Sequence, residues 1–531
     1  MNRMTTFSLA TGHNEFYVIS GSLAHIQRFI YDTSSSGALK NMRGRSFYLT
    51  LLTRAVCDYL LRKLNLEQNS VLFNSGGTFC IIAPYTANIE NVAQEAIKNI
   101  GIIVSNMVLD DIINICGIKA SREDLENHCA EIFDKLFSYR HYLKFNPHKD
   151  TDYYSLFNGI VQPHKKSYDY LCTGLRNANA ILVSSTKLSL NDCLCVDMSQ
   201  LGTYFYMGNA HKLSQVVAND AYLLIINNEP EPMGSKLPIY RDYIAGNGTR
   251  ANSFEDLFVN EDSSHKQLAV LRMDVDNLGS ILRSKMAQPN ALEAYSIFSH
   301  KLDAFFKGRI NEMWNMKYSD STVIIYAGGD DLFIVGEWEQ TTLFMQDIYN
   351  EFKRQFDTNS MSVSAGVSFV GPKFPIVRAA EISGIEESRA KAFEYKGQQK
   401  CAISMFETPL RWDYEYAQIV RYKESLVKLI SNEHIDKSFI QHIMQINENI
   451  TYVDGKITPI RNVWLAAYNL SRMASRRNRN SDGVRFIEQC VADIMSGRTL
   501  DGHIIDSPYH SLQLITIAAR LAQMTLWKIN N

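Results

Sequence analysis

The chain has 531 residues, of which 46% are apolar and 21% charged, and its formal net charge is −2. This length exceeds what one hydrophobic core supports, and the charge balance excludes a protein that binds nucleic acid through a globally basic surface. Nine cysteines without a C-x-x-C pair, no secretory signal and no apolar run of about 18 residues predict a cytoplasmic protein without structural zinc or a membrane span.

The first predicted unit spans residues 1–140 and contains a strand followed by a glycine-tipped β-hairpin. The strand covers 16–22, and the hairpin covers 71–82 with Gly76 and Gly77 at its tip. Apolar β-formers flank a turn that glycine permits, because glycine reaches positive φ without steric cost. Residues 141–260 contain five prolines and predict a loop-rich insertion, together with late strands that belong to the first unit.

The second unit, residues 261–410, has clearer elements in the order β-α-β-β-α-β. This order is the ferredoxin-like arrangement of polymerase and nucleotide cyclase palms. The predicted ranges are a strand at 268–276, a helix at 290–314, hairpin strands at 322–327 and 332–336, a helix at 339–357, a strand at 361–370, a further helix at 376–395 and a strand at 401–406.

Residues 411–531 form a helical domain without convincing strand signals, and its last well-marked helix is at 509–528. The fold class is therefore α+β, with two ferredoxin-like palms and a C-terminal helical domain. Matched spacing supports a repeat, because 56 positions separate Ser20 from Gly76 and 54 separate Asp274 from Gly328.

Carboxylates gather at one end of the second unit. Side chains alternate along the strand 268–276, so Asp274 and Asp276 lie on the face opposite its apolar residues. Asp330 and Asp331 lie at the turn of the neighbouring hairpin. Packed carboxylates repel one another unless a cation neutralises them, and oxygen ligands without nearby His or Cys favour Mg²⁺ or Mn²⁺. Two such ions could hold the attacking and leaving oxygens of a phosphoryl transfer.

The expected roles follow from these positions. Asp274 and Asp330 are the primary metal ligands, and Asp331 is either a second ligand or the group that orients or deprotonates a ribose hydroxyl. Asp276 and Asn277 are supporting candidates, Asp276 for the metal and Asn277 for the nucleotide.

Gly328 and Gly329 are expected to let the backbone approach a nucleotide closely. Gly-Gly-Asp-Asp alone is also compatible with an ordinary turn, and only its combination with the Asp-x-Asp strand favours a metal site.

Residues 274–279 (Asp-Val-Asp-Asn-Leu-Gly) and 326–332 (Tyr-Ala-Gly-Gly-Asp-Asp-Leu) together resemble the catalytic palm of the large subunit of type III CRISPR effector complexes. That palm is related to the GGDEF diguanylate cyclases. Residues 37–49 and Ser75-Gly76-Gly77 resemble the first palm of the III-A (Csm-type) branch.

The resemblance implies an enzyme that joins ATP into cyclic oligoadenylates once its complex binds target RNA. The implied partners are other subunits of the complex, crRNA and target RNA. It also implies that two ATP molecules lie between the palms, with Gly76 and Gly77 in a nucleotide pocket. Lys391 matches a phosphate-contacting lysine of the cyclases, although a solvated helix charge explains it equally well.

The first palm is expected to be catalytically silent, since Ser20 stands in the place of Asp274 and Thr78 in the place of Asp330. Many members of the family begin with an HD nuclease domain, and no such nuclease activity is expected here. Many also carry a four-cysteine zinc element between the palms, which this chain is expected to lack.

A basic cluster in the helical region comprises Arg472, Arg476, Arg477 and Arg479. It would contact RNA phosphates, or it would simply be a solvated helix end. Two alternative functions stay open: AMP transfer from ATP to another acceptor, such as an adenosyl metabolite, and a mainly architectural RNA-binding subunit.

Overall fold

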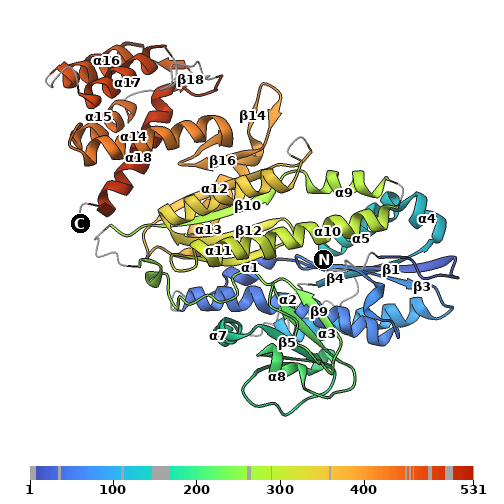
Figure 1. The fold of residues 1–531 in the computed structure, drawn as a ribbon. Helices are drawn as coiled ribbons and strands as arrows, with labels where there is room; N and C mark the ends of the chain where they lie inside the picture. The colour runs from blue at the N-terminus through green and yellow to red at the C-terminus, as the bar shows by residue number, and fades with distance from the viewer. Residues whose placement is uncertain are drawn as a thin grey trace, which may run out of the picture.

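The computed structural model arranges the chain as two stacked palms, an insertion beneath the first palm and a helical domain that projects from the second (Figure 1). The residues that it describes are 7–33, 37–108, 113–145, 167–259, 265–288, 290–357, 360–448, 451–453, 456–458, 460–475, 481–496 and 506–529. No helix in these ranges is both long and apolar enough to cross a membrane.

The first palm is a four-stranded antiparallel sheet in the order β2-β3-β1-β4. Alternate residues of β1 enter different cores, because Tyr17 and Ile19 pack on one face while Phe16 and Val18 pack on the other. Its elements are β1 (Glu15–Leu23), α1 (Ile26–Tyr31), α2 (Ala38–Lys63), η1 (Gln68–Ser70), β2 (Val71–Ser75), β3 (Thr78–Pro84), α3 (Ile89–Val108), β4 (Ile113–Ser121), α4 (Arg122–Asn127) and α5 (Cys129–Phe145).

The second palm repeats this order in β11-β12-β10-β13 and extends it with β16 and β17. The predicted β-α-β-β-α-β sequence of elements is confirmed. Its elements are β10 (Leu268–Val275), α9 (Leu278–Met286), α10 (Ala291–Asp303), the π-helix η4 (Ala304–Arg309), α11 (Ile310–Lys317), β11 (Thr322–Gly328), β12 (Asp331–Glu337), α12 (Trp338–Gln355), β13 (Val363–Val370), α13 (Ile376–Ala392), β14 (Glu394–Tyr395), β15 (Gln398–Gln399), β16 (Ala402–Met405) and β17 (Thr408–Arg411).

The insertion differs from the prediction that late strands would join the first palm. Its strands form a separate five-stranded sheet in the order β6-β7-β5-β8-β9. One face of this sheet has its own apolar core, which includes Leu182, Tyr206 and Leu223, and the other packs towards α2. Its elements are α7 (Asp169–Asn177), β5 (Ala180–Ser184), β6 (Leu194–Met198), η2 (Ser199–Leu201), β7 (Thr203–Gly208), α8 (Ala210–Ser214), β8 (Ala221–Ile226), β9 (Ile239–Asp242) and η3 (Glu255–Leu257).

The two palms pack reciprocally, since α2 of the first contacts β11 of the second and α10 of the second contacts β2 of the first. One apolar core therefore contains residues of both palms, such as Leu39 and Val323. Arg43 of α2 is buried in this interface and donates hydrogen bonds to the backbone carbonyls of Ala245 and Ile325.

The C-terminal domain is mainly helical, as predicted, and it also contains two short strands for which the sequence pattern has no convincing signal. A short hairpin of two strands lies between its second and third helices. The elements are η5 (Trp412–Tyr416), α14 (Ala417–Ser431), α15 (Ser438–Glu448), β18 (Thr451–Val453), β19 (Lys456–Thr458), α16 (Ile460–Ser475), α17 (Asp482–Ser496) and α18 (Ser511–Ile529).

Candidate active site

The predicted carboxylates meet where β10 ends and β12 begins. Asp274 and Asp331 are direct cross-strand partners in the antiparallel ladder, and Asp330 precedes Asp331 in the turn. The apolar alternation that predicted this arrangement is confirmed, because Leu271 and Met273 point into the core on the other face. Strand alternation and the hairpin thus bring three acidic side chains to one place.

Burial disfavours the ionised form of these carboxylates. Desolvation, and then the negative charges of Asp274 and Asp331, raise the pKa of Asp330 to about 7. Desolvation also raises the pKa of Asp331 to about 7, although the nearby Arg272 guanidinium opposes this shift. Oδ1 of Asp331 is buried without a hydrogen-bond partner. The cluster therefore carries negative charge that the protein's own cations do not fully neutralise.

Helix α13 supplies the nearest cation. Lys391 pairs with Asp274, and its Nζ also lies 2.9 Å from Oε1 of Glu387, one helical turn earlier. Glu387 in turn lies 3.1 Å from Nε of Arg272. Desolvation raises the pKa of Asp274, and Lys391 counteracts that rise. Lys391 is therefore part of the site and is not a solvated helix charge.

Sequence reasoning missed Arg272 and Glu387. Arg272 lies two residues before Asp274 on the same face of β10, and Glu387 lies four residues before Lys391 on α13. Strand and helix periodicity could have suggested each pair. Only the packing of α13 on β10 and β13 brings the two pairs together.

Asp276 has a different role from the predicted one. It is buried, and its carboxylate accepts hydrogen bonds from the hydroxyls of Ser362 and Ser364 and from the Cys401 backbone amide at 3.1 Å. These bonds join β10 to β13 and to the start of β16, so the structure gives Asp276 a structural role. Asn277 is exposed at the start of α9 with φ of +56° and accepts a hydrogen bond from Lys400.

The glycine pair of the second palm contacts the first palm. A Cβ on Gly328 would lie 3.2 Å from the Cα of Gly76, and a Cβ on Gly76 would lie 3.2 Å from the backbone nitrogen of Gly329. The two hairpin tips thus meet backbone to backbone. Gly77 has φ of +74°, and a Cβ there would lie 2.8 Å from Ile26. The expected approach of a nucleotide to these glycines stays a prediction.

The strand register corrects the proposed equivalence of the palms. Ser22 pairs with Thr78 across β1 and β3, as Asp274 pairs with Asp331 across β10 and β12. Ser22 therefore takes the place of Asp274, whereas spacing alone had suggested Ser20. Thr78 takes the place of Asp331 rather than that of Asp330. Both alignments leave the first palm without these acidic groups.

An arginine lies beside the corresponding strand of the first palm. Arg140 of α5 donates hydrogen bonds to Oγ of Ser20 at 3.1 Å and to the carbonyl of Gly21 at 3.2 Å. Ser20 is two residues before Ser22, as Arg272 is two residues before Asp274. Both palms therefore have a guanidinium next to the strand end, but in the first palm a helix supplies it.

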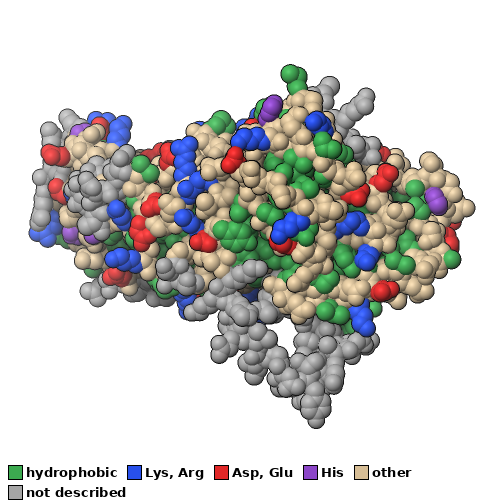
Figure 2. Space-filling model, turned by 90° about the horizontal axis from the view of Figure 1, so that it is seen from below, with side chains coloured by type: hydrophobic (Ala, Val, Ile, Leu, Met, Phe, Trp, Pro, Cys, Tyr) green, Lys and Arg blue, Asp and Glu red, His purple; other side chains and the backbone are tan. Residues whose placement is uncertain are grey.

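The predicted RNA-binding arginines are only partly described. Arg472 is exposed on α16, whereas Arg476, Arg477 and Arg479 lie outside the described residues. Helix α16 is in the projecting domain, far from the hairpin tips (Figure 1). On the face seen in Figure 2, Lys and Arg are scattered among acidic side chains and form no continuous basic field. RNA binding by these residues stays a prediction.

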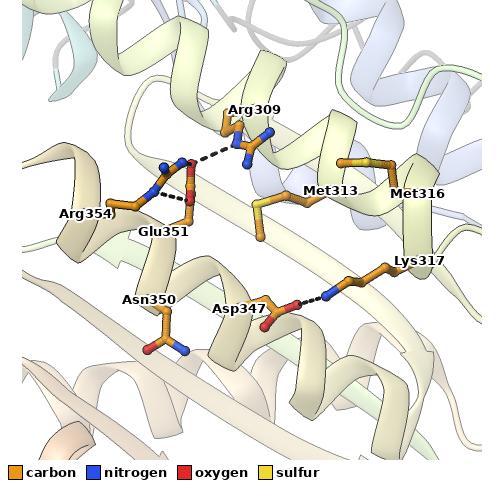
Figure 3. A pocket seen from close by; sticks show the side chains of 8 residues that line it. All are labelled: Arg309, Met313, Met316, Lys317, Asp347, Asn350, Glu351 and Arg354. Carbon is orange, nitrogen blue, oxygen red and sulfur yellow. Dashed lines mark hydrogen bonds and ion pairs between the residues drawn. The ribbon is translucent and has the colours of Figure 1, made fainter.

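A pocket between α11 and α12 is unrelated to the carboxylates (Figure 3). Ion pairs cross it, including Glu351 with Arg309 at 2.8 Å and Lys317 with Asp347 at 3.0 Å. Each of its charged side chains is already in an ion pair, with Arg354 sharing Glu351 with Arg309.

Asp274, Asp330 and Asp331 are suitable ligands for a hard divalent cation. The buried, unpartnered oxygen of Asp331 and the raised pKa values fit such an ion. Within the described ranges, no three His, Cys, Asp or Glu side chains, these aspartates included, are placed so that they could hold a metal ion by themselves. This is compatible with Mg²⁺, which is commonly held by one or two carboxylates together with substrate phosphates.

Two family models match the chain. Residues 267–400 match "Cas10/Cmr2, second palm domain", and residues 15–159 match "Csm1 subunit domain B". The first contains the carboxylate cluster, and the second contains the glycine-tipped hairpin of β2 and β3. Together they cover more than half of the chain.

Curated relatives are similar over most of the chain. The Methanocaldococcus jannaschii and Streptococcus thermophilus proteins are both named CRISPR system single-strand-specific deoxyribonuclease Cas10/Csm1 (subtype III-A). The M. jannaschii protein is 24% identical, and the alignment covers 81% of this chain and 65% of that protein. The S. thermophilus protein is 25% identical, and the alignment covers 86% of this chain and 62% of that protein. The chain thus spans less than two thirds of the length of these relatives. The expected lack of HD nuclease activity stays a prediction.

Solved structures share the fold. Csm1 of T. onnurineus aligns with a TM-score of 0.71 at 22% identity, over 96% of this chain and 70% of that chain. A Csm1–Csm4 cassette in complex with cA4 aligns with a TM-score of 0.64 at 20% identity, over the same shares. By its two matching domains and its similarity over most of its length, the chain is a homologue of the Cas10/Csm1 proteins of subtype III-A CRISPR systems.

Proposed function

We propose that the chain is a metal-dependent nucleotidyltransferase that converts ATP into cyclic oligoadenylates within a type III CRISPR complex. The observation that carries this proposal is the meeting of Asp274, Asp330 and Asp331 at the tip of the second palm, against the glycine tip of a first palm that has Ser22 and Thr78 in the equivalent places of Asp274 and Asp331. A cluster of buried carboxylates is unfavourable without a cation, so a purely architectural role leaves it unexplained.

Mg²⁺ or Mn²⁺ held by one or two of these aspartates together with the triphosphate would neutralise the triphosphate and polarise the phosphorus under attack. A ribose hydroxyl oxygen of one ATP would bond to the α-phosphorus of another, and pyrophosphate would leave. Asp331 would be either a further metal ligand or the group that accepts the hydroxyl proton. The same reaction between the two ends of one oligoadenylate would close the ring.

Lys391 is suited to contact the phosphates. Its ammonium is held beside the cluster by Asp274 and Glu387, and Glu387 is itself held by Arg272. When phosphate oxygens enter the site, the Lys391 ammonium can leave Asp274 and bind these oxygens. Its ion pair with Glu387 then keeps the ammonium in place. Arg272 and Glu387 would then position the lysine without contacting substrate.

Ligands of the similar structures support ATP as substrate and a cyclic product. Csm1–Csm4 cassettes were solved in complex with AMPPNP, pppApA, cA3 and cA4. By this similarity the proposed partners are a Csm4-type subunit and the other proteins of the complex, together with crRNA and target RNA.

Product analysis tests the proposal. The assembled complex is incubated with ATP, Mg²⁺ or Mn²⁺ and matching target RNA, beside an Asp330→Ala/Asp331→Ala variant, and products are identified by chromatography and mass spectrometry. Cyclic oligoadenylate made only by the unmutated complex is expected. AMP joined to an added acceptor would favour the alternative transferase, and unchanged ATP under both metals would favour an architectural subunit.

A further inference from the structure

The tip of the first palm is tied to the second palm by a small polar cluster beside Gly76. Ser75, the residue before Gly76, donates a hydrogen bond from its hydroxyl to the carboxylate of Asp303. Nζ of Lys307 donates to the same hydroxyl oxygen at 3.0 Å and lies 2.9 Å from Asp303. The serine hydroxyl thus uses both its proton and a lone pair in contacts with the other palm.

This cluster is well shielded from water. The side chain of Lys307 is 11% exposed and that of Asp303 is 17% exposed. Partly buried, charge-assisted hydrogen bonds are stronger and more directional than bonds at an open surface. Lys307 lies in the π-helical turn η4 that follows α10, and such turns are frequent at functional sites.

A second contact holds the same strand along the same helix. Phe73 of β2 packs against Tyr295 of α10, with ring centroids 5.1 Å apart. Strand β2 is therefore held by an aromatic pair at Phe73 and by the polar cluster at Ser75. Gly76 follows directly and lies close to Gly328 and Gly329, so that a Cβ on Gly76 would lie 3.2 Å from the backbone nitrogen of Gly329.

The catalytic turn is placed by this contact. Gly328 and Gly329 immediately precede Asp330, and the backbone carbonyl of Asp330 accepts a hydrogen bond from Val275 at 3.2 Å. A turn held by Val275 on one side and by Gly76 on the other has little freedom. A change in how this turn is held would shift the metal ligands on it, and loss of a group that hydrogen-bonds a ligand directly typically weakens metal binding about 10- to 100-fold.

We propose that Ser75, through Asp303 and Lys307, is a positioning residue for the carboxylate turn, so that the silent palm sets the metal affinity of the catalytic palm. The inference rests on the proposed function only in assuming that Asp274, Asp330 and Asp331 bind a divalent cation. The Ser75 hydroxyl bonds to Asp303 and Lys307 and not to these carboxylates, so it acts through the backbone of Gly76.

The test measures Mn²⁺ binding to the full chain by calorimetry or electron paramagnetic resonance, without ATP. Ser75→Ala removes the link but leaves the Lys307–Asp303 ion pair. We expect its Kd for Mn²⁺ to rise roughly tenfold, and Ser75→Thr, which keeps the hydroxyl, to restore binding. Gly76→Ala should weaken binding further, because its Cβ would press on Gly329 and its φ of +59° disfavours any side chain.

Ser22→Ala is the matched control, since it removes a hydroxyl from the neighbouring strand end of the same palm. It should bind Mn²⁺ like the unmutated chain. Thermal unfolding of each variant shows whether the fold is kept. Asp303→Asn should weaken binding by a similar factor, and adding Ser75→Ala to it should have little further effect if both act through one link.

Unchanged Mn²⁺ affinity in folded Ser75→Ala and Gly76→Ala would overturn the positioning role while leaving the metal site intact. An unmutated chain that binds no Mn²⁺ would overturn the metal site itself. In the assembled complex, Ser75→Ala should lower kcat for ATP turnover at limiting metal, and excess Mn²⁺ should restore it. Because bound metal also stabilises a weakened fold, thermal unfolding in the same buffers must show that Ser75→Ala is fully folded at limiting metal.

Discussion

At the scale of single residues, desolvation decides how the carboxylate cluster behaves. Asp330 and Asp331 have an ordinary pKa of 3.8, which burial raises to about 7 in the folded chain. Between these values the folded protein binds more protons than the unfolded protein. The two groups therefore contribute stability that is full below about pH 4 and is lost as the pH rises through 7.

A first prediction follows for the metal-free chain. In EDTA, the melting temperature should fall from pH 5 to pH 8, and Asp330→Asn/Asp331→Asn should make this fall shallower. Mg²⁺ or Mn²⁺ should raise the melting temperature more at pH 8 than at pH 5, because protons compete with the metal at the lower pH. Scanning fluorimetry measures both effects. Equal pH slopes for the two proteins would contradict the assigned ionisation.

A second prediction separates Asp276 from Asp274. Asp276→Asn places an amide where the carboxylate accepts bonds from Ser362, Ser364 and the Cys401 backbone. It should cost about 1–3 kcal/mol in unfolding free energy, measured by urea titration, and leave Mn²⁺ affinity unchanged.

Asp274→Asn should behave in the opposite way, with weak Mn²⁺ binding and little loss of stability. It removes a charge that burial already disfavours. A large loss of Mn²⁺ affinity in Asp276→Asn, without unfolding, would return Asp276 to the metal ligands.

At the scale of elements, the site depends on how closely α13 approaches the sheet. A Cβ on Gly366 of β13 would lie 2.0 Å from the backbone nitrogen of Glu387 and 2.4 Å from the carbonyl oxygen of Ser383. Only glycine allows this approach. The same close approach of α13 to the sheet brings Glu387 and Lys391 next to the carboxylates.

A third prediction concerns this contact. Gly366→Ala should lower the unfolding free energy by about 1–3 kcal/mol or more, because α13 must move outwards. The displaced Lys391 should raise the KM for ATP in the assembled complex. Gly371→Ala is the control, since its Cβ would meet no atom within 4 Å. Equal stability of the two variants in urea would contradict the close approach of α13.

At the scale of the whole molecule, the palms are two copies of one unit that share an apolar core. Ile19 and Leu39 of the first palm belong to the same core as Val270, Val323 and Phe333 of the second. Reciprocal packing of α2 on β11 and of α10 on β2 buries one edge strand of each sheet. Neither palm can bury these faces alone.

A fourth prediction is that residues 1–260 and 261–531, expressed separately, will aggregate or unfold without a cooperative transition. Co-expressed, they should co-purify and melt cooperatively, because the shared core is then complete. Size-exclusion chromatography and calorimetry measure this. Two halves that are each monomeric and cooperatively folded would show that the shared core is not required.

The sequence by itself determined the repeated strand and hairpin units, the α+β class and three of the acidic residues of the site. These features depend on local periodicity and turn chemistry, so Asp274, Asp330 and Asp331 could be identified without a structure. Period-2 alternation assigned Asp274 to its face of β10, and glycine marked both hairpin tips.

Tertiary structure alone decided which side chains those acids meet. The sequence separates Arg272 from Glu387 and Ser75 from Asp303 by more than 100 residues, so no local pattern connects them. Alternation assigned Asp276 to the right face but could not foresee the serines that bind it. Spacing suggested Ser20 as the counterpart of Asp274, which is two residues from Ser22. Only the strand pairing shows that Ser22 lies opposite Thr78. Local periodicity and turn chemistry determine the helices and strands, and long-range packing determines which of their side chains are in contact.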